Sequence, residues 1–579
     1  MKRVPIFCSL LPVEFIASKG FEPYYLKAEE LSQVERTEYH CAFHENICSY
    51  SKALYEYLLK NHAEFSHIII PTSCDAMKKL YSALLPHVGK EKLFVLDFPK
   101  NKDERAVKFY AEELKRLSSW CHCEAIAEAI PITQLHKGDC HAPSGLAMTS
   151  LKIGIIGSNV ADAPFEKVFP RFGAEKVFLN HCLDKCRMDE AFLARLSAEK
   201  LSFEEIARYY VERSCCPRMN DETYKKAMVE RIKEESLKGV IVNTLKFCDF
   251  YPFDQMYIRK ELGESFPVLN VEHDLMSKDE GQIMTRLEAF LESIKKKGMG
   301  SRGQGQKKNG RYFVGIDSGS HATKLVMVDK DCKVLADEIL STGTSVKEAA
   351  GKGFESILKK AGVSKDDVSL IIATGYGRNS IDFANESVTE ITCHALGAHS
   401  ILKGGGTLID IGGQDSKAIK INKDGGVIKF VMNDKCAAGT GRFLEVIADR
   451  LEMDLEEFAR LAIKAKEGVS VSSMCSVFAE SEVISLIAAG NTREEISKGI
   501  HESIASRTSS LIKRVDGEPP YYMSGGVAKN MAMVKELSES LGENVKVIEN
   551  PQTVGALGAA IHGVRLDFLT LDLKSRSQA

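Results

Sequence analysis

The first half of the chain alternates short apolar runs with longer stretches in which apolar residues recur every three or four positions. Short runs bounded by polar or glycine residues indicate buried strands of a parallel sheet, and the stretches between them indicate amphipathic helices. Strands are expected within residues 67–75, 92–98, 151–159, 238–244 and 267–274. This order predicts a doubly wound, Rossmann-like α/β arrangement in two lobes that meet near residue 150.

The second half contains one pattern twice. The segments "IDSGSHATK" (316–324) and "IDIGGQDSK" (409–417) each follow an apolar strand and share Asp-x-Gly, with a lysine seven residues beyond the aspartate. Two copies of one strand–turn–strand unit predict a duplicated α/β domain with a cleft between the copies.

A basic, glycine-rich segment separates the two halves. Residues 295–311, "KKKGMGSRGQGQKKNGR", contain almost no large apolar residues, which is typical of a flexible, solvated tether rather than a nucleic-acid site. The predicted organisation is an α/β lobe at 1–150, a second at 151–294, a linker at 295–311 and the duplicated domain at 312–570.

Composition gives no support for several classes of partner. The 579 residues are 44% hydrophobic and 27% charged, and their formal net charge is −3. This balance gives no electrostatic reason to expect nucleic acid or an acidic membrane surface as a partner. No apolar run approaches the length of a membrane span, and Glu14 interrupts the apolar start without a visible cleavage site. We therefore expect a cytoplasmic protein.

Glycine-rich turns suggest a nucleotide site. An Asp-x-Gly turn lets backbone N–H groups approach phosphate oxygens, and carboxylates hold hydrated Mg²⁺. A third turn, "MSGGVAKN" (523–530), could pass beneath a nucleobase or ribose, whereas a P-loop is excluded because GxxxxGK[ST] is absent. The candidate catalytic residues are Asp317, Asp410 and Gln414, the two aspartates also being candidate Mg²⁺ ligands. The candidate nucleotide-binding residues are Ser318, Gly319, Ser320, Lys324, Gly412, Gly413, Gly525 and Gly526.

The order of these turns resembles the ATPase superfamily of actin, sugar kinases and heat-shock chaperones. A closer resemblance, over 312–565, is to the ATP-dependent activators of 2-hydroxyacyl-CoA dehydratases and benzoyl-CoA reductases (BadF/BadG/BcrA/BcrD type). Besides the two repeated segments and "SGGVAKN", the motifs that carry it are "ATGYGRNSI" (373–381), "EITCHALGA" (390–398), "NDKCAAGTGRFLE" (433–445), "SSMCSVFAESEVIS" (472–485) and "GALGAA" (555–560). The resemblance implies a duplicated actin-like (ribonuclease H-like) fold that uses ATP and Mg²⁺.

Two cysteines of this half stand at or near predicted helix N-termini, Cys436 before "AAGTGRFLEVIADRL" and Cys475 before "SVFAESEVISLIAAG". The positive end of a helix dipole lowers a thiol pKa and stabilises a negatively charged cluster. Read alone, each could be a small core residue. The resemblance implies that they are ligands of a [4Fe–4S] cluster shared across a homodimer, two from each chain.

Cysteines of the first half form a second candidate set. Cys74 and Cys248 lie just past the ends of predicted strands, where open α/β sheets bind ligands, and Cys48 lies in a helical context. The segments "LPVEFIASKGFEPYYL", "ENICSYSK", "PTSCDAM", "LKFCDFYPFDQ" and "GQIMTRLEAFLESI" resemble the 2-hydroxyacyl-CoA dehydratase D-component family, which includes benzoyl-CoA reductase subunits and double-cubane cluster proteins. This implies that Cys48, Cys74 and Cys248 hold a second iron–sulfur cluster, a single four-iron cluster or a double cubane.

The remaining cysteines are assigned to the core. Sixteen are scattered along the chain without zinc-finger spacing. Cys215 and Cys216 could be an extra ligand but are favoured as core. The others assigned to the core are Cys8, Cys41, Cys121, Cys123, Cys140, Cys182, Cys186, Cys332 and Cys393.

The combined resemblance implies ATP-dependent, low-potential electron transfer from an activator domain to a dehydratase- or reductase-like domain on the same chain. Ferredoxin or flavodoxin would be the donor, a separate dehydratase or reductase subunit a possible partner, and an acyl-CoA or another small molecule the substrate. One alternative makes the first half a docking module of an ATPase that activates another enzyme. A second alternative, a sugar or acyl kinase, predicts no iron and leaves the cysteine motifs unexplained.

Overall fold

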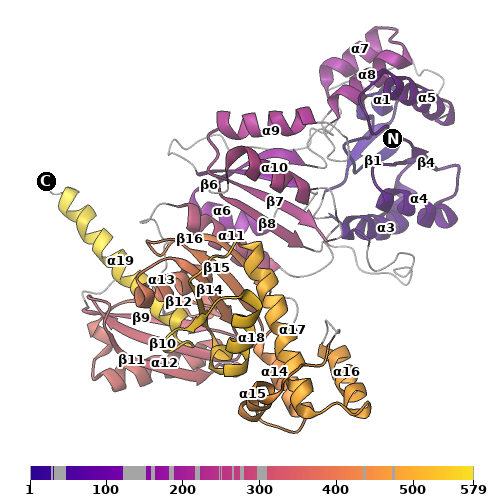
Figure 1. The fold of residues 1–579 in the computed structure, drawn as a ribbon. Helices are drawn as coiled ribbons and strands as arrows, with labels where there is room; N and C mark the ends of the chain where they lie inside the picture. Colours follow the sequence, from indigo (N-terminus) through magenta and orange to yellow (C-terminus); the bar gives the residue numbers. More distant parts are fainter. Residues whose placement is uncertain are drawn as a thin grey trace. The chain divides into compact units, whose positions relative to one another are not determined.

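The chain is described by a computed structural model and forms two compact units, Met1–Leu287 and Glu288–Ala579, which are treated separately below (Figure 1). The structure describes residues 2–27, 30–31, 47–121, 151–157, 163–181, 188–214, 222–246, 248, 251–263, 266–273, 280–295, 310–433, 439–471 and 476–577. Cys436, Cys475, Cys215, Cys216 and residues 296–309 of the expected linker lie outside this set.

The first unit is built from parallel strands and helices. Its strands are β1 (Arg3–Ile6), β2 (Glu22–Tyr25), β3 (Ile68–Pro71), β4 (Leu93–Leu96), β5 (Leu151–Gly157), β6 (Ala174–His181), β7 (Gly239–Leu245) and β8 (Val268–His273). Its helices are α1 (Val13–Ser18), α3 (Ser49–Asn61), α4 (Asp75–Val88), α5 (Glu104–Trp120), α6 (Ala163–Phe172), α7 (Glu190–Ala198), α8 (Phe203–Arg213), α9 (Glu222–Glu234) and α10 (Pro252–Leu262), and α11 (Glu280–Ile294) crosses the boundary between the units.

All five strands expected from apolar runs are present as β3, β4, β5, β7 and β8. Strands β3 and β4 pair in parallel, and β6, β5, β7 and β8 form a parallel sheet in that order. The sequence did not indicate β6, because charged residues interrupt its apolar positions. The first unit is therefore a mixed α/β structure with parallel strand pairing, as expected.

The second unit contains two five-stranded sheets. Its strands are β9 (Tyr312–Ser318), β10 (Ala322–Asp329), β11 (Val334–Ser341), β12 (Val368–Thr374), β13 (Glu386–Ser387), β14 (Gly406–Ile411), β15 (Ser416–Ile421), β16 (Val427–Asn433), β17 (Tyr521–Ser524) and β18 (Val545–Val547). Its helices are α12 (Val346–Ala361), α13 (Glu390–Leu402), α14 (Gly441–Arg450), α15 (Leu455–Lys464), α16 (Ser476–Ala488), α17 (Arg493–Arg514), α18 (Met531–Leu541) and α19 (Val554–Ser577).

The two sheets have the same topology. The first has the order β11-β10-β9-β12-β13 and the second β16-β15-β14-β17-β18. In each, the first strand in sequence pairs antiparallel with the second and parallel with the fourth. This correspondence confirms the internal duplication that the repeated Asp-x-Gly segments predicted.

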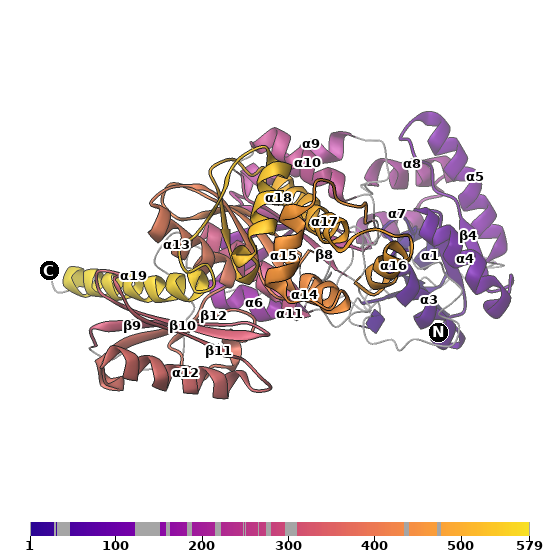
Figure 2. The same ribbon diagram turned by 60° about the horizontal axis from the view of Figure 1, so that its bottom comes forward.

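Successive side chains of β9 point alternately into hydrophobic cores on the two faces of the first sheet. Val314 and Ile316 pack in one core cluster with Phe354 of α12, whereas Phe313 packs in another with Ala556 and Ala560 of α19. Helices α12 and α19 therefore cover opposite faces of this sheet (Figure 2).

Glycines allow α13 and α19 to cross closely. A Cβ added to Gly558 would lie 1.7 Å from the carbonyl oxygen of Cys393, and one added to Gly397 would lie 2.1 Å from that of Val554. Only glycine permits such an approach, so the "GALGAA" segment has a packing role at this crossing.

Among the described helices, none has both the length and the apolar composition required to cross a bilayer.

Candidate functional site

The repeated aspartates and lysines occupy equivalent positions in the two sheets. Asp317 lies opposite Lys324 in the β9–β10 ladder, and Asp410 lies opposite Lys417 in the β14–β15 ladder. The lysine Nζ is 3.5 Å from Asp317 Oδ2 in the first pair and 3.4 Å from Asp410 Oδ2 in the second. The seven-residue spacing thus places a cation directly across a hairpin from each carboxylate.

On the side opposite the lysine, each aspartate is flanked by the neighbouring parallel strand. Thr374 of β12 is in register with Asp317, and Ser524 of β17 is in register with Asp410 and donates a hydrogen bond of 2.8 Å to its Oδ1. Each of these strands is followed by a glycine with positive φ, Gly375 at 83° and Gly525 at 90°. A Cβ on Gly375 would lie 2.5 Å from Asp317 Oδ1, so the turn passes directly over the carboxylate.

The first two predicted phosphate turns approach one another. A Cβ added to Gly413 would lie 3.4 Å from Nδ1 of His321, which belongs to the first turn. In the first turn the Gly319 N–H donates to the Ala322 carbonyl over 3.0 Å, while Ser320 is exposed. Gln414 is exposed at the tip of the second turn, where no described contact fixes it.

Ser318 and the third turn occupy more enclosed positions. The hydroxyl of Ser318 is buried and lies 2.9 Å from that of Thr323, so it is already paired within the sheet. Gly525 donates its N–H to the Pro551 carbonyl over 2.8 Å, and Gly526 begins the short helix η6 (Gly526–Lys529).

A buried histidine connects the two aspartates, and sequence reasoning did not identify it. His394 of α13 has Nε2 3.4 Å from Asp410 Oδ1, and its Nδ1 is 2.8 Å from the Glu390 carbonyl oxygen. A Cβ added to Gly555 would lie 2.8 Å from both His394 Cε1 and Asp317 Oδ2, so these atoms converge on one point. The only sequence signal was a polar residue within the apolar "EITCHALGA" segment.

Neighbouring charges control the protonation states of His394, Asp410 and Lys417. Burial would lower the pKa of His394, but Asp410 and Asp317 outweigh it and raise that pKa to about 9. Burial would raise the pKa of Asp410, but His394 and Lys417 hold it well below its ordinary value. The pKa of Lys417 lies well above its ordinary value because Asp415, Glu390 and Asp410 outweigh its burial. This cluster of residues therefore keeps ionised Asp410 beside the cations of His394 and Lys417.

The donor set of the cleft suits Mg²⁺. Asp317 and Asp410 are both buried and offer hard carboxylate oxygens, which Mg²⁺ prefers together with its own waters and substrate phosphates. Their lysine partners stand beyond 3.3 Å, a distance longer than a close charge-assisted hydrogen bond. We would assign these two aspartates to Mg²⁺ and the backbone of the turns to phosphate.

The second phosphate turn is hydrogen-bonded to the start of α14. The N–H of Gly441 donates to the Gly412 carbonyl over 2.8 Å, and that of Arg442 donates to the Gly413 carbonyl over 2.9 Å. Cys436 precedes this helix in the sequence, and Cys475 immediately precedes α16, which begins at Ser476. Helix α16 thus begins directly after Cys475, whereas α14 begins five residues beyond Cys436.

Three cysteines of the first unit lie in one neighbourhood. Cys48 and Cys74 are the N-cap residues of α3 and α4, and Cys248 follows β7. Burial raises the pKa of Cys48 to about 12, with further contributions from Cys248 and Cys74. Burial also raises the pKa of Cys74, and Cys248 adds to it. Thiols that influence one another in this way are near neighbours.

Backbone donors face two of these thiols. The N–H groups of Tyr50 and Ser51 lower the pKa of Cys48, and those of Met77 and Ala76 lower the pKa of Cys74. Helix N-termini stabilise thiolates and the anionic clusters they bind, so the chemistry of these positions fits an iron–sulfur group. Within the described parts of the chain, however, no three His, Cys, Asp or Glu side chains are grouped closely enough to hold a metal ion.

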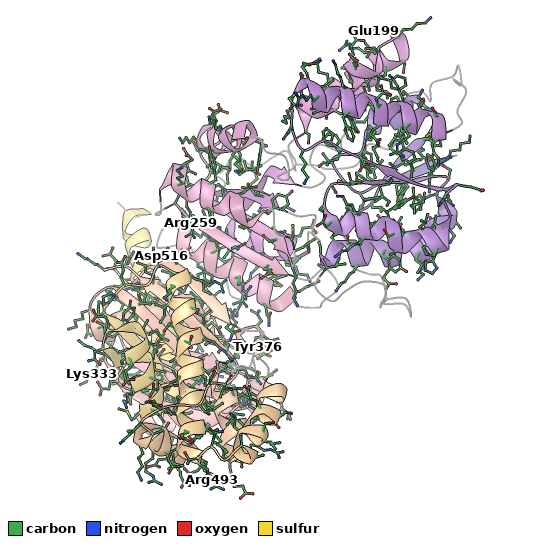
Figure 3. All side chains as sticks on the ribbon, turned by 45° about the vertical axis from the view of Figure 1, so that its right-hand side comes forward. Glu199, Arg259, Lys333, Tyr376, Arg493 and Asp516 are labelled. Carbon is green, nitrogen blue, oxygen red and sulfur yellow. The ribbon has the colours of Figure 1, made fainter. Side chains whose placement is uncertain are left out.

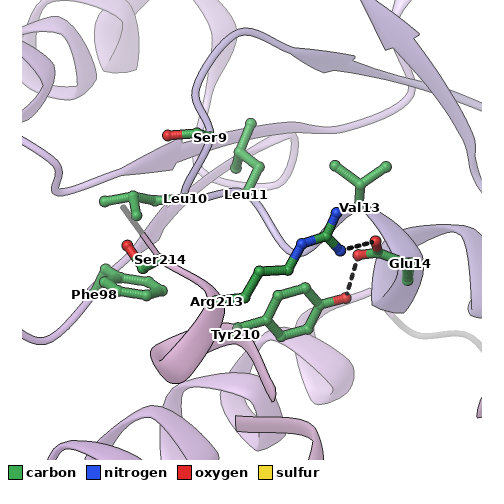
Figure 4. Close-up of a pocket in the computed structure, with 9 residues that line it drawn as sticks. All are labelled: Ser9, Leu10, Leu11, Val13, Glu14, Phe98, Tyr210, Arg213 and Ser214. Atoms are coloured by element: carbon green, nitrogen blue, oxygen red, sulfur yellow. Dashed lines mark hydrogen bonds and ion pairs between the residues drawn. The ribbon is translucent and has the colours of Figure 1, made fainter. Parts of the chain in front are cut away.

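A small cavity lined by both apolar and polar side chains also lies in the first unit (Figure 4). Its volume is about 20 Å³, enough for about one water molecule. Buried Glu14 accepts a hydrogen bond of 2.9 Å from the Tyr210 hydroxyl and pairs with Arg213 at 3.0 Å. Sequence reasoning did not single out this cluster, whose members are about 200 residues apart. Its size excludes an acyl-CoA in the cavity as it stands.

Comparison with known families defines the class of protein. The BadF/BadG/BcrA/BcrD ATPase family matches residues 314–563. The 2-hydroxyglutaryl-CoA dehydratase D-component family matches residues 8–125 and 147–294. The chain therefore belongs to the BadF/BadG/BcrA/BcrD ATPase family and carries a D-component domain ahead of the ATPase domain.

Individual relatives match over nearly their whole length. The activator of lactoyl-CoA dehydratase from Anaerotignum propionicum is 45% identical over 43% of this chain and 96% of its own. The (R)-2-hydroxyglutaryl-CoA dehydratase activating ATPase from Acidaminococcus fermentans is 42% identical over 44% of this chain and 97% of its own. The crystal structure of the Acidaminococcus fermentans dehydratase component A covers 43% of this chain and 96% of its own, with a TM-score of 0.42 and 42% identity.

Proposed function

We propose that this chain couples ATP hydrolysis in its second unit to low-potential electron transfer into its D-component domain. The ATPase part of this proposal rests on membership of a family whose relatives include dehydratase activators. The electron acceptor on the same chain is proposed from the D-component match and its three neighbouring cysteines. The chemistry would be of the 2-hydroxyacyl-CoA dehydratase or benzoyl-CoA reductase type, or the reduction of another small molecule.

The nucleotide would bind between the two repeated turns. The backbone of Gly413 would receive phosphate oxygens, while Asp317 and Asp410 would hold Mg²⁺. The N–H groups of Gly319 and Gly412 already donate to the carbonyls of Ala322 and Asp415 within their own turns. Lys324 and Lys417 stand beside the same carboxylates and would limit the negative charge of the occupied cleft. Charge stabilisation by such preorganised groups is the largest contribution in most phosphoryl-transfer sites.

One observation supports the proposed coupling between the nucleotide site and the cysteine-bearing segment. The two hydrogen bonds from Gly441 and Arg442 tie the start of α14 to the second phosphate turn. A change in that turn between ATP and ADP would displace α14 and the cysteine-bearing segment before it. Cys436 and Cys475 of two chains would hold a [4Fe–4S] cluster, which when bound supplies one-electron chemistry at low potential.

In the first unit, Cys48, Cys74 and Cys248 would hold the accepting cluster. Helix N-terminal N–H groups would face it at α3 and α4, which favours its anionic state. A ferredoxin or flavodoxin would supply the electron, and a separate dehydratase or reductase subunit could complete the substrate site.

An electron-delivery experiment on the full chain tests this function. Anaerobic protein is reduced by reduced ferredoxin with or without Mg²⁺ and ATP, and the EPR signals of the clusters are followed over time. In the wild-type protein we expect the EPR signal of the first unit to appear only when ATP is present. In Asp410→Asn we expect no such signal even with ATP. An equal rate of reduction without ATP would refute the coupling.

A further inference from the structure

The last helix of the D-component match ends inside the ATPase unit. Helix α11 runs without interruption from Glu280 to Ile294, and its residues from Glu288 onward belong to the second unit. Residues 147–294 match the D-component family, whereas the ATPase family match begins only at residue 314. The carboxyl-terminal half of α11, residues 288–294, is therefore a part of the ATPase unit that the ATPase family match does not cover.

A buried ion pair holds this half-helix. The Arg378 guanidinium donates to Glu288 Oε2 over 2.6 Å, and the side chains are only 4% and 3% exposed. Pairs as enclosed as this tolerate the loss of one partner poorly, because the remaining charge stays buried. Glu288 and Arg378 must therefore move together.

A second carboxylate of the half-helix caps α13. Glu292 accepts a hydrogen bond of 3.1 Å from the backbone N–H of Thr389, the N-cap residue of α13, and further bonds from the hydroxyls of Thr389 and Thr392. A carboxylate at this position accepts hydrogen bonds from donors that would otherwise be unpaired, and its negative charge interacts favourably with the helix dipole. Ala289, between the two glutamates, packs in the same apolar cluster as Ile391 of α13.

Both contacts continue to the nucleotide cleft. Arg378 also donates to the Gly375 carbonyl over 3.1 Å, and Gly377 donates its N–H to the Ser318 carbonyl over 2.9 Å. The same turn lies over the carboxylate of Asp317, and Tyr376 at its tip is exposed (Figure 3). One continuous set of contacts thus runs from Glu288 to Asp317.

The second route passes through α13. This helix begins at the threonine capped by Glu292 and carries His394, which pairs with Asp410 one and a half turns later. Each aspartate of the cleft is therefore connected to α11 through a single intervening segment.

We propose that residues 288–294 of α11 are a docked coupling element, through which the nucleotide state of the cleft controls the end of the D-component domain. The proposal rests on the nucleotide binding argued above and adds a second route besides α14. Such coupling is reciprocal. If nucleotide binding changes the equilibrium for packing of residues 288–294 against the ATPase unit, then a substitution that weakens this packing must change nucleotide affinity.

Hydrogen exchange on the full-length protein tests the proposal. Exchange of the 288–294 amides is compared without nucleotide, with Mg²⁺ and ADP, and with Mg²⁺ and a non-hydrolysable ATP analogue. We expect the two nucleotides to produce exchange rates that differ by about fivefold or more in this segment. The amides of α5, in the first unit, serve as the reference within the same samples.

Matched variants separate coupling from stability. Glu288→Gln keeps the side-chain volume and removes the charge, and Glu292→Gln weakens the cap of α13. We expect each to change the dissociation constant of the ATP analogue by about fivefold, and Glu280→Gln, at the exposed start of the same helix, to leave it unchanged. Glu280 is 52% exposed and pairs only with exposed Lys167 among its described contacts.

The outcomes distinguish this inference from the proposed function. If calorimetry detects no binding of ADP or the analogue to the wild-type protein, the proposed function fails. If nucleotides bind but the 288–294 amides exchange at the same rate in every state, the coupling element is refuted. A misfolded Glu288→Gln protein leaves both the wild-type exchange comparison and Glu292→Gln to decide the question.

Discussion

At the residue scale, the cleft is defined by pairs of charges that the sequence only partly revealed. The Asp-x-Gly segments and the lysines seven residues beyond them could be predicted, because a hairpin register fixes that spacing. His394 could not be predicted, because its role depends on α13 bringing it to Asp410. Sequence spacing records contacts within a hairpin, whereas contacts between distant elements leave no such record.

Asp410→Asn tests the role of the paired aspartates. The substitution keeps the shape and the Ser524 contact but removes the charge that would hold Mg²⁺. We expect ATP turnover to fall by about 10²-fold or more, with the iron content unchanged. The matched control is Asp382→Asn, which removes an exposed partner of Lys347. Equal turnover in the two variants would contradict the cleft assignment.

The pH dependence of stability tests the His394–Asp410 pair. The pKa of folded His394 is raised to about 9, above the ordinary value of 6.5. The pair therefore contributes its full stability below pH 6.5 and loses it as the pH rises through about 9. The contribution is on the order of 3 kcal/mol.

The measurement is denaturant unfolding of nucleotide-free, Mg²⁺-free protein at several pH values between 6 and 10. We expect the free energy of unfolding of the second unit to fall over this range, and the decline to be smaller in His394→Gln. Parallel declines in the two proteins would show that another group is responsible.

At the element scale, the apolar pattern was a good guide to strands, but it carries no information on which residues the acidic side chains of a helix contact. The five expected strands of the first unit formed, but β6 was missed because charged residues interrupt it. The "GQIMTRLEAFLESI" segment belongs to the D-component match, which ends at residue 294, and its Glu288 and Glu292 contact Arg378 and Thr389 of the second unit. Buried acidic residues on a helix look like a solvated face until their partners are known.

The crossing of α13 and α19 gives a prediction at this scale. In Gly558→Ala the new Cβ would meet the Cys393 carbonyl oxygen at 1.7 Å, so the helices must separate. We expect the second unit to lose about 1–3 kcal/mol of stability. Gly351→Ala in α12 is the control, because no atom lies within 4 Å of its added Cβ.

Chemical denaturation of both variants makes this comparison. The control should be as stable as the wild type or up to about 1 kcal/mol more stable, since alanine favours a helix over glycine. Similar losses in both variants would mean that the close crossing is not what requires glycine at position 558.

At the scale of the whole molecule, the chain joins two families that its sequence motifs had already indicated. The ATPase family covers residues 314–563, and the D-component covers residues 8–125 and 147–294. The duplication of the ATPase half is visible in its two identical sheet orders. The contacts of α11 and α14 within the second unit could not be predicted, because sequence spacing does not record contacts between distant elements.

The central claim is that both halves carry iron–sulfur clusters, and the iron and sulfide content of anaerobically purified full-length protein tests it most directly. A shared four-iron cluster gives about two irons per chain, and a cluster in the first unit adds at least about four. The shared cluster should be lost in the double variant Cys436→Ala/Cys475→Ala. The cluster of the first unit should be lost in the triple variant Cys48→Ala/Cys74→Ala/Cys248→Ala. A wild-type value near two irons per chain, unchanged by the second set of substitutions, would contradict the account and make the first half a docking module.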